Sequence, residues 1–291
     1  MGVSMPIDYQ AVGRSTEFTE HQVDARWLMA YAAGLRDFNA HYLDTEANVV
    51  CAHPVFPVCL EWPSILATRN LFGDQLTQEE SSKGVHASHD LHIYRPIMAG
   101  EVLRTTAKLI GIRKIKPGAG YDLQIDSFDK DGKLVCRTYQ FGIYRGVATS
   151  GSPITHAATP PLPKASKLVG KQSEITILEG AAHTYTECAR IWNPIHTDRR
   201  FALAAGLPDI ILHGTATLAL AVSELVNKFV EGDPKRVKRL GCKFSAMVFM
   251  PSALNLATSD CIQKDGHTII SFELYRADGA PAISQGFLVF E

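Results

Sequence analysis

The stretch Tyr185–Ala221, YTECARIWNPIHTDRRFALAAGLPDIILHGTATLALA, gathers polar residues between apolar segments. The Asn-Pro pair at 193–194 predicts a turn, because proline fixes its own φ and moves the preceding residue out of helical geometry. Gly214 begins an apolar run that is typical of a helix, and the first N–H groups of a helix have no partner inside it. The pattern therefore predicts a site in which His196 and His213 face the Gly214 amide, a donor that can stabilise developing negative charge.

The same pattern occurs earlier in the chain, which indicates an internal duplication. Arg36–Asp44 (RDFNAHYLD) aligns without gaps with Arg190–Asp198 (RIWNPIHTD), and His53-Pro54 aligns with His213-Gly214 a little later. An apolar segment that is expected to be helical follows in each copy. These expected helices span 55–71 and 215–230, and a further helical pattern runs from Thr19 to Leu35.

Strand-like segments follow the apolar helix in each copy. We expect strands at 84–94, 102–114, 120–127 and 134–144, and again at 236–248, 253–262, 268–275 and 283–290. One such unit leaves sheet edges open, whereas two units can pair their strands into one sheet. The sequence therefore predicts an α+β fold, with units at 1–148 and 169–291 that each wrap an antiparallel sheet around a long central helix. A Pro/Ser/Thr-rich linker is expected at 149–168.

The motif resembles the MaoC-like, hydratase-2 family of (R)-specific enoyl-CoA hydratases and 3-hydroxyacyl-thioester dehydratases. The matching positions are Asn193, Pro194, Ile195, His196, Ala202, His213 and Gly214. The resemblance implies a double hot-dog fold, and it implies that His196 and Gly214 are catalytic, with Asn193 beside them. In the family an Asp stands where this chain has Ile191, so the carboxylate that works with the histidine is missing.

The residues expected to line the substrate are Trp192, Ile191, Asp198, His213 and Asp37. Several site residues also admit structural roles: Asn193 can shape the turn, Asp198 can cap the next helix, Gly214 can serve packing, and His213 can be a buried support. Asp37 is the carboxylate that the first copy keeps. Either it is shared with His196, or, as the plainer interpretation, the first copy is degenerate and its pocket receives the acyl tail.

Composition excludes several classes of protein. The chain has 291 residues, is 46% hydrophobic and 20% charged, and carries a formal net charge of -1, which argues against dedicated binding to nucleic acid or an anionic membrane. Six scattered cysteines and no recognisable targeting signal lead us to expect a cytoplasmic protein. No cofactor and no membrane segment are expected, and a homodimer of double hot dogs is left open.

Two clusters of polar residues allow either a functional or a structural interpretation. His86, Asp90 and His92 would share one face of a strand and His89 the other, and without further ligands we expect a structural strand and no metal. A basic cluster is either a solvated face or a contact for the phosphates of a CoA or carrier arm. It consists of Lys235, Arg236, Lys238, Arg239 and Lys243.

Three functions remain open from the sequence. The first is a hydro-lyase that acts on a 3-hydroxyacyl or 2-enoyl thioester carried by CoA or an acyl carrier. The second uses the same pocket for a specialised dehydration, isomerisation or cyclisation, with Ile191 and Trp192 making a drier site. The third is a non-catalytic acyl-binding or partner subunit, because Asp and His never occur in the same copy.

Overall fold

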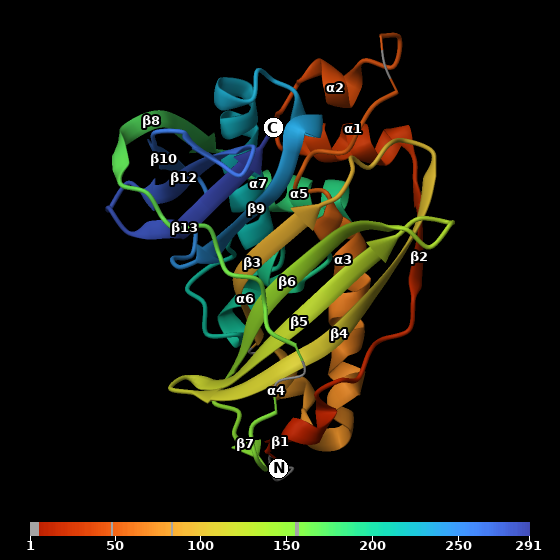
Figure 1. Ribbon diagram of the computed structural model, residues 1–291. Coiled ribbons are helices and arrows are strands. Elements are labelled where there is room, and N and C mark those ends of the chain that lie inside the picture. The colour runs from red at the N-terminus through yellow and green to blue at the C-terminus, as the bar shows by residue number, and fades with distance from the viewer. Residues whose placement is uncertain (1–5, 48, 83, 155–156) are drawn as a thin grey trace.

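The computed structural model describes residues 6–47, 49–82, 84–154 and 157–291. These residues form one long antiparallel sheet and a small parallel pair of strands (Figure 1). The order along the long sheet is β2-β4-β5-β6-β3-β9-β13-β12-β10-β8, with β11 paired to β12. The first five strands thus mirror the last five across the β3–β9 pair, as expected for a duplicated unit.

The strands of the two halves correspond in their order along the sheet. The first half contributes β2 (Thr19–Val23), β3 (Gly84–Ile93), β4 (Glu101–Ile115), β5 (Gly118–Phe128) and β6 (Leu134–Arg145). The second half contributes β8 (Leu168–Ile177), β9 (Val237–Phe244), β10 (Ser252–Ser259), β11 (Ile262–Lys264), β12 (His267–Arg276) and β13 (Pro281–Phe290). The parallel pair consists of β1 (Ile7–Asp8) and β7 (Thr149–Ser150).

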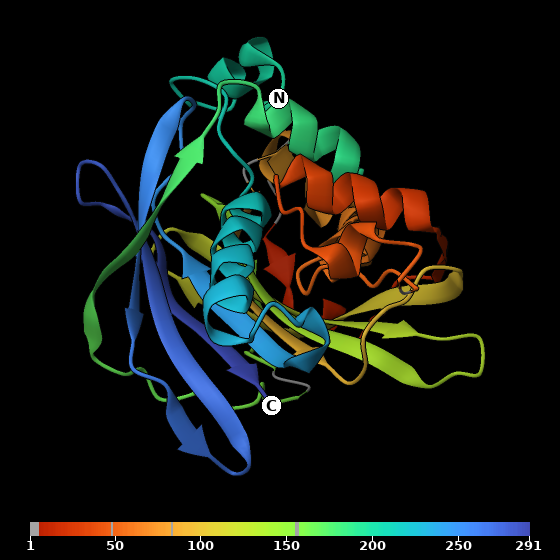
Figure 2. The same cartoon turned by 90° about the horizontal axis from the view of Figure 1, so that it is seen from above.

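Each half-sheet curves around a central helix. In the second half this is α7 (Gly214–Phe229), which is apolar on most of its surface and lies in the concave face of the sheet (Figure 2). Its counterpart α3 (Pro57–Ala67) contains Pro63 and continues as a 3₁₀ segment, η2 (Thr68–Gln75). The double hot-dog architecture predicted from the sequence is confirmed.

Two further helices pack against each other where the halves meet. They are α1 (Ala25–Gly34) and α5 (Ala181–Ala189), which lie side by side in Figure 2. A Cβ on Gly34 would lie 2.9 Å from the Cβ of Cys188, so glycine permits this close approach. The hydroxyls of Tyr31 and Tyr185, which occupy equivalent positions in the two copies, lie 3.3 Å apart. The approximate two-fold axis therefore passes between these tyrosines.

The sheet is continuous across the halves because β3 pairs with β9. On this seam the Asp90 carboxylate accepts two hydrogen bonds from the Arg239 guanidinium, both 2.8 Å long, and both side chains are largely buried. A charge pair in such a place must be matched, since removing one partner leaves the other charge buried and unpaired. The pair thus fixes the register between the two half-sheets.

One predicted helix boundary was wrong. Thr19–Val23 forms the strand β2, which pairs with β4, and the helix begins only after Asp24, whose side chain accepts a hydrogen bond from the Trp27 amide. Pairing with β4 across eighty residues of chain overrides the local helical pattern. The remaining short elements are η1 (Tyr9–Ala11), α2 (Ala40–Leu43), α4 (Gln78–Ser82), η3 (Pro194–His196), α6 (Arg199–Ala204) and η4 (Pro234–Arg236).

Candidate active site

The turn that carries His196 is built by two caps. Helix α5 ends at Arg190, which adopts the left-handed conformation with φ 57°. The Asn193 side chain then accepts a hydrogen bond from the Ile195 amide, and the Asp198 side chain accepts one from the Arg200 amide at 2.8 Å to begin α6. The structure therefore gives Asn193 and Asp198 capping contacts, the structural alternative for each residue.

His196 is buried and holds one defined hydrogen bond. Its side chain packs in the core with 8% of the residue exposed, and Nδ1 lies 2.8 Å from the carbonyl oxygen of Ile211. A carbonyl only accepts, so Nδ1 carries the hydrogen and Nε2 keeps a free lone pair in the neutral ring. Burial lowers the pKa of His196 to about 4, and the Ile211 carbonyl opposes this only in part. The imidazole is thus neutral at pH 7 and can accept a proton at Nε2.

His213 stacks on His196, with ring centroids 3.6 Å apart. Its Nε2 lies 3.2 Å from the Thr186 hydroxyl, and Tyr185 packs against the other side of the ring. Burial, and then the nearby His196, hold the pKa of His213 well below its usual value. His213 therefore supports His196 as a neutral, buried ring.

Gly214 is the first residue of α7 and directly follows His213. Its amide belongs to the first turn, where backbone N–H groups have no partner within the helix, and the positive end of the helix dipole adds to it. A Cβ on Gly214 would lie 2.9 Å from the Phe244 ring on β9, so this position is too crowded for a larger residue. The structure thus combines a helix-start amide and a neutral imidazole in one segment.

The sequence also predicts Ile191 and Trp192 as substrate-lining residues, and the structure buries only Ile191. Ile191 is buried, and its carbonyl oxygen is 3.4 Å from His213 Nε2. Trp192 is 59% exposed, and its indole N–H reaches Glu187 at 3.5 Å, so the structure does not bring it to the histidine pair. No carboxylate contributes to the shifted pKa of His196. The apolar character of the site therefore comes from Ile191 and the surrounding core.

Asp37 belongs to a second group of buried residues in the first half. Its Oδ1 accepts a hydrogen bond from the Asn39 amide at 3.3 Å, while Oδ2 is buried without a partner in the described chain. Tyr42 stands at the position of His196; burial, followed by the charge of Asp37, raises its pKa well above the usual value. Asp37 is thus in the electrostatic range of Tyr42, and no described contact joins it to His196.

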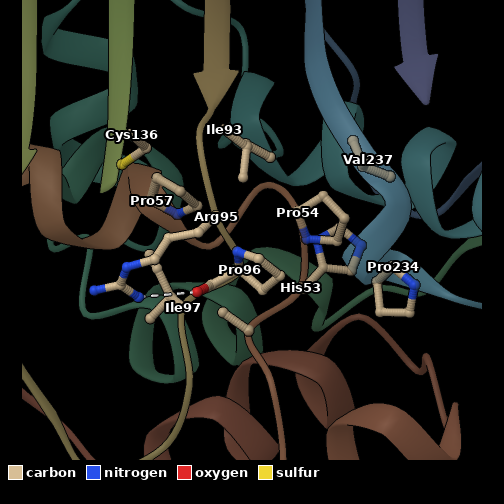
Figure 3. Close-up of a pocket in the computed structure, with 11 residues that line it drawn as sticks. His53, Pro54, Pro57, Ile93, Arg95, Pro96, Ile97, Cys136, Pro234 and Val237 are labelled. Carbon is tan, nitrogen blue, oxygen red and sulfur yellow. Dashed lines mark hydrogen bonds between the residues drawn. The ribbon is translucent and has the colours of Figure 1, made fainter. Parts of the chain in front are cut away.

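The first half also lacks the amide donor of the second. Pro54 aligns with Gly214, and proline has no backbone N–H. The cavity beside His53 and Pro54, which Arg95 and Pro234 also line, has a volume of only about 20 Å³ (Figure 3). This is room for roughly one water molecule. The first copy therefore differs from the second by tyrosine in place of histidine and proline in place of glycine, and the cavity beside its His-Pro pair is small.

In comparison with known proteins, the two halves of the chain match different family models. Residues 163–276 match the family described as MaoC like domain, and residues 10–137 match the FAS1-like, dehydratase domain region. The C-terminal half of this chain is a MaoC-like domain. The motif residues His196, His213 and Gly214 all lie inside the matched segment.

Relatives of the MaoC-like domain include named enzymes. The chain is 27% identical to peroxisomal enoyl-CoA hydratase 2 of Arabidopsis thaliana over 57% of its own length and 56% of that enzyme. It is 23% identical to 3-hydroxyacyl-thioester dehydratase X of Mycobacterium tuberculosis, over 88% and 84% of the two chains. It spans less than a quarter of the mouse peroxisomal multifunctional enzyme type 2 that it also matches.

Solved structures share the fold of both halves. A MaoC-like dehydratase from Phytophthora capsici superposes with a TM-score of 0.79 at 19% identity and covers 97% of each chain. A conserved hypothetical protein of Mycobacterium tuberculosis, described as a double hot-dog fold, gives a TM-score of 0.64 at 13% identity over 99% and 98% of the chains. At these identities the likeness shows the fold alone.

The strand that holds the histidines of the first half differs from the expected register. A bulge in β3 between His86 and Ser88 shifts the alternation, so His86 faces His89, with ring centroids 5.4 Å apart, and not Asp90 and His92. An extra residue in a strand reverses which face later side chains occupy. Within the described residues no group of three or more His, Cys, Asp or Glu has a metal-binding arrangement.

Most residues of the basic cluster, which lies in η4 and β9, make contacts within the protein. Arg239 binds Asp90, Lys238 lies 3.1 Å from the Glu291 carboxylate, and Arg236 donates to the Glu291 carbonyl. These contacts support a structural role for most of the cluster. In the part of the chain that the structure describes, no helix is both long and apolar enough to span a membrane.

Proposed function

We propose that this protein is a hydro-lyase that acts on 2-enoyl and 3-hydroxyacyl thioesters, using the site on its MaoC-like domain. The observation that carries the proposal is the arrangement of His196, a neutral imidazole with Nε2 free, next to the helix that begins at Gly214. The names of the relatives, an enoyl-CoA hydratase and a 3-hydroxyacyl-thioester dehydratase, support the same reaction class.

The Gly214 amide would bind the thioester carbonyl oxygen. As water adds to C3 of the enoyl group, electron density moves to that oxygen, and a preformed N–H donor in a dry site stabilises it. Removing one such donor from an enzyme costs about 10²- to 10³-fold in rate. The crowding of Gly214 by Phe244 keeps the first turn of α7 in place for this role.

His196 would perform both proton transfers. Nε2 takes a proton from the attacking water, and the imidazolium then gives that proton to C2, so that water is added overall and the ring returns to its neutral form. One base can serve both steps when the two new bonds form on the same face of the substrate. The low pKa of His196, about 4, makes the imidazolium a strong acid for the second transfer.

One assay tests the proposal. Loss of the enoyl-CoA absorbance on hydration should be catalysed by the wild type and fall about 10²- to 10⁴-fold in His196→Ala, the usual effect of losing an acid/base group. Tyr42→Phe is the matched control, because Tyr42 occupies the same position in the first copy and its hydroxyl has no hydrogen-bond partner in the described chain. Equal activity of wild type and His196→Ala would refute the mechanism.

A second candidate follows from Ile191, which leaves the histidine without a carboxylate. In that case the protein binds acyl thioesters without turning them over, alone or as the partner of an active subunit. A wild type that binds an acyl-CoA in calorimetry but shows no hydration favours this candidate. All six cysteines are unpaired, which is usual in a reducing compartment, and we propose that the protein is cytoplasmic.

A further inference from the structure

A second cavity lies beside the start of α7, where Leu212 and Ala216 flank the His213-Gly214 pair, and neither His196 nor Gly214 is among its lining residues. Its volume is about 200 Å³, and it is bounded by the end of α1, the end of β8, helix α5 and helix α7. Most of its wall is aliphatic, with Leu212, Ala216 and Leu220 on one side and Ala181 on another. Arg36 stands at its margin.

The internal duplication shows what fills the corresponding place in the first half. Two backbone hydrogen bonds recur at equivalent positions at the ends of α1 and α5, Asp37 N to Ala32 O and Ile191 N to Thr186 O, and they fix the alignment of these helices. Ala181 in the cavity wall therefore corresponds to Trp27. By the alignment of His213 with His53, Ala216 corresponds to Phe56.

In the first half these aromatic side chains are buried and pack against each other. The Trp27 and Phe56 rings meet edge to face with centroids 5.0 Å apart. The guanidinium of Arg190 lies 3.9 Å from the centroid of the Trp27 ring, and the indole N–H donates to the carbonyl of Cys188 at 3.1 Å. The indole is thus held on its face by a cation and at its edge by a helix-end carbonyl.

The second half keeps an arginine and a helix-end carbonyl at the corresponding positions, but it lacks the two aromatic rings. Arg36 corresponds to Arg190 and has the same left-handed backbone, with φ 60° against 57°. Gly34 corresponds to Cys188, lines the cavity, and is the last residue of α1, so its carbonyl accepts no bond within that helix. The two aromatic residues are replaced by Ala181 and Ala216.

We propose that this cavity binds a planar aromatic group with an N–H on its edge, in the manner in which the first half holds the indole of Trp27. The ring face would lie under Arg36 as a cation–π contact, and the ring N–H would donate to the Gly34 carbonyl. An apolar cavity of about 150 Å³ suffices to hold benzene in an engineered protein, so the space here admits a two-ring group. This inference goes beyond the proposed function, because it concerns binding and not turnover.

The test uses indole as the probe and ligand-detected NMR saturation transfer with the full chain. Indole should bind the wild type, and Ala181→Trp and Ala216→Phe, which rebuild the first-half filling, should each weaken binding at least about tenfold, a contribution typical of losing a whole ring's burial. Either substitution can prevent folding, so both variants are made and the folding of each is checked by thermal unfolding. 1-Methylindole, which lacks the N–H, should bind more weakly than indole.

The two arginines give a matched pair of controls. Arg36→Gln should weaken indole binding about two- to fivefold, the size of an exposed cation–π contact. Arg190→Gln alters the equivalent position where the ring is the protein's own, so indole binding should be unchanged. Absence of binding to the wild type, or binding that folded Ala181→Trp and Ala216→Phe leave intact, would overturn the proposal. Neither result depends on thioester hydration.

Discussion

The imidazole rings of His196 and His213 stack with centroids 3.6 Å apart and planes 24° from parallel. Two rings this close cannot both carry a proton without strong repulsion, and both are buried. The stack therefore keeps a neutral pair, in which His196 has a lone pair at Nε2 and His213 packs against it as a buried ring.

The pH dependence of activity follows from this arrangement. Protonation of Nε2 removes the lone pair, and the pKa of His196 is lowered to about 4 by burial. We expect the acid limb of kcat/KM for enoyl-CoA hydration to fall with a midpoint near pH 4, and not near 6.5, the usual value for histidine. Circular dichroism at each pH separates loss of activity from unfolding, and a midpoint near 6.5 would contradict the structural assignment.

Restoring a carboxylate beside His196 is a second test. Ile191→Asp should raise hydration activity at least about tenfold, since one acid/base group is worth 10²- to 10⁴-fold in favourable cases. The substitution should also lower the free energy of unfolding, because the new carboxylate replaces a buried apolar side chain. Asp37→Asn removes the equivalent carboxylate of the first copy and should leave activity unchanged. A stable Ile191→Asp protein without gain would favour the non-catalytic candidate.

Gly214 should not tolerate a side chain. The Cβ of Gly214→Ala would lie 2.9 Å from the Phe244 ring, so we expect the free energy of unfolding to fall by about 1–3 kcal/mol, as for overpacked cores. The same shift moves the amide and should lower kcat. Urea unfolding of Gly214→Ala, Phe244→Leu and the double variant measures the coupling. If the two effects simply add, the contact is not the cause.

Glu61 links stability to pH. It lies fully buried in α3, where the Thr138 hydroxyl donates to it, and burial raises its pKa to about 7 from an ordinary 4.5. The folded protein binds the Glu61 proton more tightly than the unfolded chain does. The stabilisation that results is therefore complete below pH 4.5 and is lost as the pH rises through 7. This amounts to about 3 kcal/mol.

Glu61→Gln removes that titration and isolates it from other groups. The buried histidines act in the opposite direction, because their lowered pKa values make stability fall as the pH drops below 6.5. The useful quantity is therefore the difference in the free energy of unfolding between wild type and Glu61→Gln, measured by urea between pH 4.5 and 8. We expect the wild type to lose stability relative to Glu61→Gln as the pH rises. A constant difference would show that Glu61 is ionised throughout this pH range.

Local sequence patterns predicted much of the fold. The β4, β5, β6, β12 and β13 strands begin and end within a few residues of the expected positions, and Gly132 and Gly279 adopt the positive φ, 78° and 81°, that their turns require. These features depend on neighbouring residues, which a sequence displays directly. The edge strands β2 and β8 were missed, because their partners β4 and β10 are distant in the chain.

The sequence by itself determined the duplication, most of the strands and the motif from Asn193 to Gly214, because repeats and turns are written in adjacent residues. Only the tertiary structure decided that His196 stacks on His213, that Asp37 belongs with Tyr42, and that a bulge turns His86 toward His89. It also decided that Ala181 and Ala216 line a cavity at the place that corresponds to the packed rings of Trp27 and Phe56. Such contacts, and the pKa values that follow from burial, arise only when segments far apart in the chain exclude water together.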